Sequence, residues 1–140
     1  MARHLARLSP GDYFALLAYV DMTAAHVASL QHVRHRVRDA RRVATCLGFG
    51  PRFLHSTGQA YKGGPNTGVF LQITGDDPCD LAIPGFGYTF AVVRDAQARG
   101  DFAVLTERRR RALRVHVHGD PTEGLEALDR ALATALGDAP

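Results

Sequence analysis

The sequence contains few cysteines and one lysine, and it lacks any long apolar run. Its two cysteines, Cys46 and Cys79, lie far apart and outside any CxxC pattern, which argues against a disulfide scaffold or a zinc site and for a reducing compartment. No apolar stretch approaches the ~18 residues of a transmembrane helix. The first residues also lack the apolar core of a secretory signal. We therefore expect a cytoplasmic protein with no membrane partner.

The length and the charge balance narrow the possible classes further. The 140 residues predict one domain, spanning residues 1–140 and large enough to bury a real core. The net charge of +3 is too small to indicate nucleic-acid binding. The arginine run at 108–111 has no interleaved aromatic residues, and at a helix end it would complement the helix dipole. We expect no nucleic-acid partner.

The basic residues are almost all arginine. Of the 17 lysines and arginines, Lys62 is the one lysine. A high-GC codon bias explains the arginines, but it does not explain why this lysine is present. Lys62 is therefore a candidate functional residue.

Apolar periodicity and turn residues divide the chain into alternating strands and helices. We predict strands at 12–20, 43–49, 69–74 and 113–118. Helices are predicted at 23–38, capped by Asp21 or Thr23, and from Pro121 onward, capped by Asp120. Residues 52–62 predict a helix or loop, 75–87 a loop, and 89–99 and 102–110 two helices broken at Gly100-Asp101. This order predicts an α/β three-layer sandwich, with a small, mostly parallel sheet of about four strands and helices on both faces.

The predicted strand 113–118 alternates apolar and polar side chains, so one of its faces is expected to be exposed or covered by a partner. His116 and His118 form an H-x-H pair on that face. Metal binding needs a third or fourth ligand, and the sequence alone identifies none. We expect no metal site and no cofactor.

The densest polar segment of the chain is 53–68, which follows the carboxyl end of a predicted strand, where ligands bind in open α/β sheets. Its glycines and small hydroxyl residues would let backbone N–H groups approach an anion. Lys62 can neutralise a phosphate or an oxyanion, and His55 can move protons near neutral pH. The alternative is a tight loop whose side chains satisfy its own backbone.

The segment HSTGQ-x-x-KGGPNTGVFLQIT (55–74) also carries a family resemblance. It resembles the C-terminal sugar-isomerase (SIS-type) part of the glucose-6-phosphate isomerase module in bifunctional transaldolase/phosphoglucose isomerase proteins. The likeness includes GDYFALLAY (11–19), GFGPRF (48–53) and DLAIPG (80–85), and it covers nearly the whole chain. The resemblance implies half of a sugar-isomerase-type fold.

The activity implied by this resemblance is aldose–ketose isomerisation of a sugar phosphate or a similar small anion. In that chemistry an acid/base pair opens the ring, and a carboxylate base moves a proton between C2 and C1 through an enediol. Lys62 would be the ring-opening or charge-stabilising group. The other candidate site residues are His55 and Tyr61 for catalysis, and Ser56, Thr57, Gln59 and Asn66 for substrate binding.

The chain departs from the family at two points. Ala60-Tyr61 stands where the family commonly has Leu-His, and the domain that supplies the phosphate loops and the carboxylate base is missing. Asp76, Asp77 and Asp80, in the predicted loop after the third strand, could replace that base. We therefore expect activity only when a complementary sugar-isomerase domain or a homodimer completes the site. The alternatives are a repurposed small-molecule enzyme of a biosynthetic pathway, or a non-catalytic interaction or regulatory module.

Overall fold

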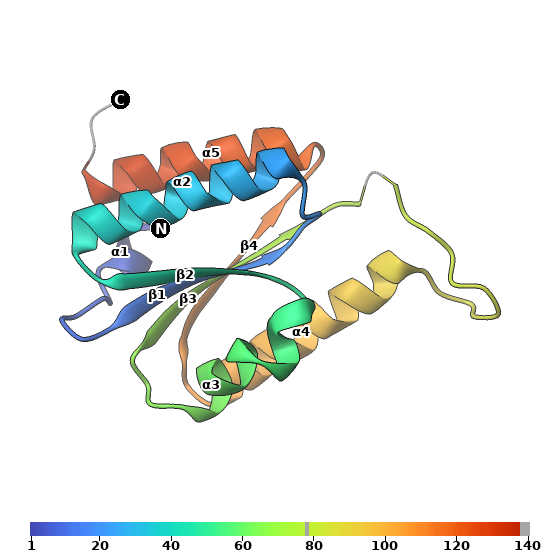
Figure 1. The fold of residues 1–140 in the computed structure, drawn as a ribbon, viewed down its shortest axis with the longest axis horizontal. Helices are drawn as coiled ribbons and strands as arrows, with labels where there is room; N and C mark the ends of the chain where they lie inside the picture. The colour runs from blue at the N-terminus through green and yellow to red at the C-terminus, as the bar shows by residue number, and fades with distance from the viewer. Residues whose placement is uncertain (78, 138–140) are drawn as a thin grey trace.

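The computed structural model describes residues 1–77 and 79–137. Its described part forms a three-layer α/β fold around a four-stranded parallel sheet with the strand order β2-β1-β3-β4 (Figure 1). The predicted fold class is confirmed. The strands are β1 (Tyr13–Tyr19), β2 (Ala44–Phe49), β3 (Gly68–Gly75) and β4 (Arg111–Val117).

Helices cover both faces of the sheet, as Figure 1 shows. One face carries α1 (Ala2–Leu5), α2 (Ala24–Arg41) and α5 (Pro121–Leu136). The other carries the 3-10 helix η1 (Arg52–His55), α3 (Thr57–Gly63) and α4 (Phe90–Glu107). Within the described residues, no helix combines the length and the apolarity needed to cross a bilayer.

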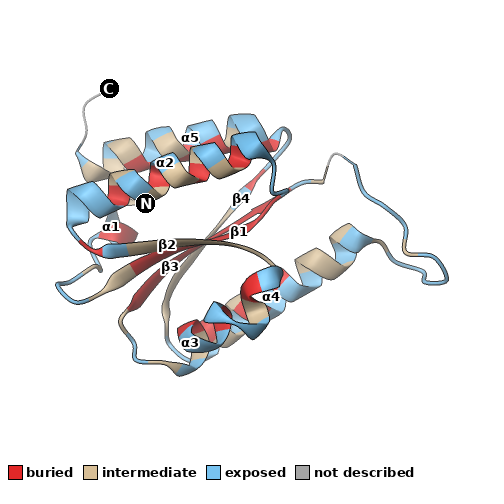
Figure 2. Ribbon diagram, in the orientation of Figure 1, coloured by how far each residue is buried: buried red, intermediate tan, exposed pale blue. Residues whose placement is uncertain are grey.

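The strand β1 lies at the centre of two apolar cores. Its residues Phe14 and Leu16 pack towards α2 and α5, whereas Leu17 and Tyr19 pack towards α3 and α4. Because a parallel strand of this kind is covered on both faces, its sequence is a continuous apolar run rather than an alternating one. Figure 2 shows β1 and β3 as the most deeply buried strands.

The predicted helix starts follow their capping residues. Thr23, rather than Asp21, caps α2, since its hydroxyl accepts a hydrogen bond from the His26 N–H at 3.1 Å. Asp120 caps α5 by accepting from the Thr122 N–H at 2.7 Å, with Pro121 in the first turn.

The predicted break at Gly100-Asp101 is wrong, because α4 runs without interruption from Phe90 to Glu107. One glycine costs a helix only about 1 kcal/mol. The buried side chains of Ala98 and Leu105 hold this helix against the sheet on both sides of the predicted break. The short helix α1 was not predicted, since its four residues carry no periodic pattern.

Two helical glycines provide a matched test of packing. A Cβ added at Gly100 meets nothing within 4 Å, whereas one at Gly124 of α5 would lie 2.6 Å from Val117 Cβ. Gly100→Ala should therefore raise the free energy of unfolding by about 0.5–1 kcal/mol. Gly124→Ala should lower it by about 1–3 kcal/mol through overpacking. Urea denaturation measures both, and equal effects would contradict the packing at α5.

His4 of α1 predicts a pH dependence of stability. Its buried ring lies with Nε2 2.9 Å from the Phe70 carbonyl oxygen, and burial lowers the pKa of His4 from 6.5 to about 4. The unfolded chain therefore takes up a proton that the folded chain refuses. The stability that burial of the neutral His4 ring allows is fully present above pH 6.5 and is lost as the pH falls to about 4.

The loss should amount to roughly 2 kcal/mol, since some solvent screening remains. Urea denaturation at pH 7 and pH 4.5 measures it, and His4→Gln should flatten this part of the profile. The exposed His55 offers the control His55→Gln, which should keep the full slope. An unchanged slope in His4→Gln would contradict the assignment.

Candidate functional site

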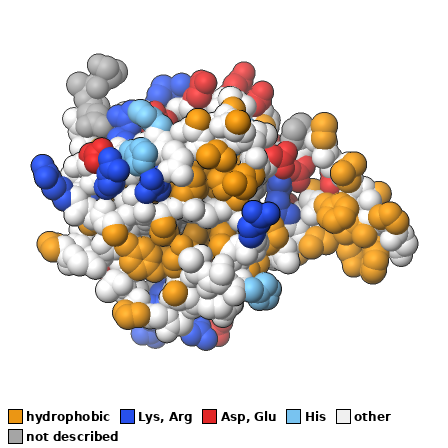
Figure 3. All heavy atoms as spheres, viewed as in Figure 1, with side chains coloured by type: hydrophobic (Ala, Val, Ile, Leu, Met, Phe, Trp, Pro, Cys, Tyr) orange, Lys and Arg blue, Asp and Glu red, His pale blue; other side chains and the backbone are white. Residues whose placement is uncertain are grey.

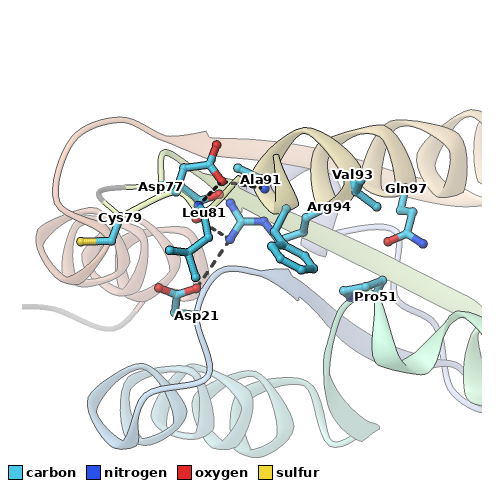
Figure 4. A pocket seen from close by; sticks show the side chains of 11 residues that line it. Asp21, Pro51, Asp77, Cys79, Leu81, Ala91, Val93, Arg94 and Gln97 are labelled. Carbon is cyan, nitrogen blue, oxygen red and sulfur yellow. Dashed lines mark hydrogen bonds and ion pairs between the residues drawn. The ribbon is translucent and has the colours of Figure 1, made fainter. Parts of the chain in front are cut away.

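The connections of the sheet create a crevice at the carboxyl ends of β1 and β3. The chain leaves β1 for α2 on one face and leaves β3 for α4 on the other. In open α/β sheets, ligands bind where neighbouring connections diverge in this way. The crevice found there has a volume of about 360 Å³ (Figure 4). Its lining is Asp21, Pro51, Asp77, Cys79, Asp80, Leu81, Phe90, Ala91, Val93, Arg94 and Gln97.

Arg94 of α4 is the centre of this crevice. Its guanidinium lies 2.6 Å from a carboxylate oxygen of Asp77 and 3.7 Å from one of Asp21. It also donates a hydrogen bond to the Gly75 carbonyl at 3.2 Å. Figure 4 shows Arg94 between the two carboxylates. This one side chain therefore connects the segments that follow β1 and β3 to the start of α4.

The carboxylates of the crevice differ in their environments. Burial raises the pKa of Asp77, and the negative charges of Asp21 and Asp80 add to this effect while Arg94 opposes it. Asp80 instead accepts backbone hydrogen bonds from Leu81 and Ala91, and its pKa is lowered, chiefly by a hydrogen bond from Thr89. Of these two carboxylates, the environment of Asp77 is therefore the one that favours the protonated form.

The chemistry of the lining suits a polar organic ligand. The carboxylates of Asp21 and Asp77 can accept hydrogen bonds from hydroxyl groups, and the Gln97 amide can both donate and accept. Leu81, Phe90 and Val93 provide an apolar wall beside them.

The polar segment 53–68 lies elsewhere, on η1, α3 and the turn before β3. Tyr61 is buried beneath α3 among the rings of Tyr13, Phe53 and Phe70, with its hydroxyl 3.3 Å from Cys46 Sγ. Burial raises the pKa of Tyr61 well above its usual range. Its environment is that of a core residue.

Lys62 forms a buried ion pair. Its Nζ lies 3.0 Å from a carboxylate oxygen of Asp101, with side chains only 16% and 3% exposed. The Lys62 carbonyl accepts hydrogen bonds from Arg108 and Arg110. Lys62 therefore joins α3 to α4 and to the chain entering β4.

Other candidates in the segment contact the nearby backbone. Ser56 donates a hydrogen bond to the Phe53 carbonyl at 3.2 Å, and Gln59 donates to the Leu54 carbonyl at 2.6 Å. The Asn66 carbonyl accepts from Arg111 at 2.9 Å. His55 and Thr57 are exposed. Within the described residues, the crevice lining contains none of the seven sequence-predicted site residues, although Pro51 borders their segment.

Sequence reasoning missed Asp21, Arg94 and Gln97 as site residues. Position in the chain could have identified Asp21, because Asp21 follows β1 just as Asp76 and Asp77, which the sequence did suggest, follow β3. The carboxyl ends of parallel strands meet at one edge of the sheet. Arg94 and Gln97 lie in α4 without a motif around them, so their place in the crevice depends on the fold.

Comparisons with known proteins support the fold alone. The sequence matches no protein-family model and no curated protein. The structure is similar to the crystal structure of a hypothetical protein from Thermus thermophilus, with a TM-score of 0.72 and 17% sequence identity. The match covers 96% of this chain and 36% of the other, so this chain spans about a third of that protein's length.

The Lys62–Asp101 pair predicts a large effect on stability. Lys62→Met leaves a buried carboxylate without its cation and should lower the free energy of unfolding by about 3–5 kcal/mol. The double variant Lys62→Met/Asp101→Asn should recover most of this loss. Urea denaturation of the single and double variants measures the coupling.

A matched control comes from the exposed pair of Arg38 and Asp39 on α2. Arg38→Met should change the free energy of unfolding far less than Lys62→Met does, because solvent screens an exposed pair. If Lys62→Met cost no more than Arg38→Met, the buried pair would not carry the structural role assigned to it.

Proposed function

We propose that this chain is one half of a sugar-phosphate isomerase site, with the ligand bound in the crevice around Arg94 and Asp77. Isomerisation then requires a complementary sugar-isomerase domain or a second copy of the chain. The observation that carries the proposal is the Asp77–Arg94 pair, which faces a crevice at the divergence of β1 and β3. The family resemblance of 55–74 supplies the substrate class.

In this proposal Asp77 takes the place of the missing carboxylate base. Its carboxylate accepts the C2 proton of the open-chain aldose phosphate, and the electron pair of that C–H bond forms the C1=C2 double bond as the carbonyl oxygen O1 takes up a proton to give the enediol. The O2 hydroxyl then loses its proton, so that one proton has in effect passed from O2 to O1, and Asp77 returns the carbon-bound proton to C1, which gives the ketose and regenerates the carboxylate. The guanidinium of Arg94 stabilises the negative charge that develops on the substrate oxygens.

Lys62 and Tyr61 take no catalytic part in this proposal. The Lys62 ammonium is paired with buried Asp101, and the Tyr61 hydroxyl lies in the core beside Cys46. The binding of sugar hydroxyls is assigned instead to Asp21 and Gln97, which line the crevice.

An exposed apolar arm supports the need for a second chain or domain. This arm (residues 79–92) comprises the connection from β3 to α4 and the first residues of α4, and an isolated bridge between Ala82 and Thr89 lies within it. Figure 3 shows its apolar side chains gathered on one projecting surface. Leu81, Phe86, Phe90 and Val92 are each more than half exposed. An apolar surface of this kind is typical of a protein interface, and its root borders the crevice.

Calorimetric titration with 6-phosphogluconate and with fructose 6-phosphate tests the proposal. We expect saturable binding, and ligand at 100 times the dissociation constant should add about 2.7 kcal/mol to the free energy of unfolding. Asp77→Asn and Gln97→Ala should each weaken binding by about tenfold, a loss of about 1.4 kcal/mol. The distant exposed variant Asp39→Asn should leave binding unchanged.

The arm variant Phe86→Ser/Val92→Ser, whose two residues lie outside the crevice lining, separates binding from completion of the site. It should still bind the sugar phosphate but lose the isomerase activity that depends on a second chain. Absence of binding to any sugar phosphate would contradict the proposal. Binding of a phosphate-free small molecule instead would favour the repurposed enzyme. If the wild-type chain binds no small molecule and the arm variant only loses the self-association of the wild-type chain, the interaction module would be favoured.

A further inference from the structure

Two histidines and one carboxylate meet on the exposed edge of the sheet, outside the lining of the crevice. His116 Nε2 lies 3.0 Å from one carboxylate oxygen of Asp76, and His118 Nδ1 lies 3.6 Å from the other. One ligand atom from each of the three residues falls within 4.8 Å of the other two. We call Asp76, His116 and His118 the histidine cluster.

The sheet register brings these residues together. His116 pairs with Thr74 across β3 and β4, so Asp76, two residues after Thr74, emerges beside His118. His116 lies on the edge strand β4 and His118 follows the end of that strand, two residues further on. Their ring centroids lie 4.5 Å apart. The third ligand that the sequence pattern lacked therefore comes from the segment that follows the neighbouring strand β3.

The ligands of the cluster are already oriented by neighbouring groups. Thr74 Oγ1 lies 2.8 Å from His116 Nδ1, which holds that ring with Nε2 directed towards Asp76. The Gly119 N–H donates to the second oxygen of Asp76 at 3.0 Å. Such outer hydrogen bonds fix the tautomer and the direction of metal-binding side chains in proteins.

We propose that the histidine cluster binds a divalent transition-metal ion of the zinc type through His116 Nε2, His118 Nδ1 and a carboxylate oxygen of Asp76. Bonds of 2.0–2.1 Å in a tetrahedron place ligand atoms roughly 3.3 Å apart. His116 Nε2 already lies 3.0 Å from Oδ1 of Asp76, and all three ligand atoms lie within 4.8 Å of one another, so small side-chain rotations bring them to an ion. An ion bound at His116 Nε2 leaves the N–H of the neutral ring on Nδ1, where it can donate to Thr74 Oγ1. The remaining coordination positions hold water.

The donor set favours this class of ion over calcium or magnesium. Two imidazole nitrogens suit zinc, cobalt, nickel or copper, whereas calcium and magnesium prefer ligand sets made of oxygens. The cluster also lies at the surface, since His118 is 84% exposed. An ion can therefore reach it without any movement of the fold.

Calorimetric titration of the tag-free full chain with Zn²⁺ tests the proposal. A Cys79→Ser background removes the exposed thiol from competition. We expect one equivalent to bind, and His118→Ala and Asp76→Asn should each weaken binding at least about tenfold, because loss of even an outer partner costs 10–100-fold. Thr74→Val should weaken it about tenfold. Co²⁺ in place of Zn²⁺ should give a visible absorption spectrum that His118→Ala abolishes.

The matched control is His32→Ala, which removes another exposed imidazole that lies beside a carboxylate, 3.7 Å from Asp129. It should leave Zn²⁺ binding unchanged. His118 is too exposed for its loss to unfold the chain, and circular dichroism checks Asp76→Asn and Thr74→Val. Absence of saturable binding would overturn the proposal, because the cluster would then be an imidazole–carboxylate ion pair. Binding that survives His118→Ala but is lost in His32→Ala would overturn it as well.

Discussion

The burial of the two central strands on both faces is the constraint on which the rest of the structure depends. Each strand of a parallel sheet needs a crossover connection, and apolar side chains on both faces of β1 and β3 need helices above and below. The apolar stripes of α2 and α5 cover one face, and α3 and α4 cover the other. Because the connections after β1 and β3 go to opposite faces, their carboxyl ends are left open to a ligand.

The helix α4 is held at two points by ion pairs of different kinds. Near its start, Arg94 joins Asp77 and Asp21 at the border of the crevice. Two turns later, Asp101 pairs with Lys62 beneath α3. The first pair borders the crevice, whereas the second links α3 to α4 away from it. The same type of interaction thus serves the proposed site at one end of the helix and stability at the other.

The segment 55–74, on which the proposed family relationship rests, does not line the crevice. Tyr61 lies in the core and Lys62 pairs with Asp101, whereas Ser56 and Gln59 bind the nearby backbone. The crevice is formed by residues that follow other strands, chiefly Asp21 and Asp77, with Arg94 from α4. In the proposal, a sugar-phosphate half-site connects the resemblance with the crevice, and the exposed apolar arm is the surface that a completing partner would contact.

Local patterns determined most of the fold. The continuous apolar runs predicted the buried strands, and Thr23 and Asp120 marked two helix starts, because capping and periodicity depend on residues close in sequence. Gly100 led to a wrongly predicted helix break, because the burial of Ala98 and Leu105 outweighs the low helix propensity of one glycine. Length and spacing could not predict α1, which is too short to show a period.

The sequence by itself thus determined the order of strands and helices, the apolar faces and the unusual status of Lys62. Tertiary structure decided what the polar residues do. It paired Lys62 with Asp101, 39 positions away in the sequence. It also brought Asp77 to Arg94, and Asp76 to His116, from neighbouring elements. These partners are set by strand register and helix docking, which bring together groups that no local pattern relates.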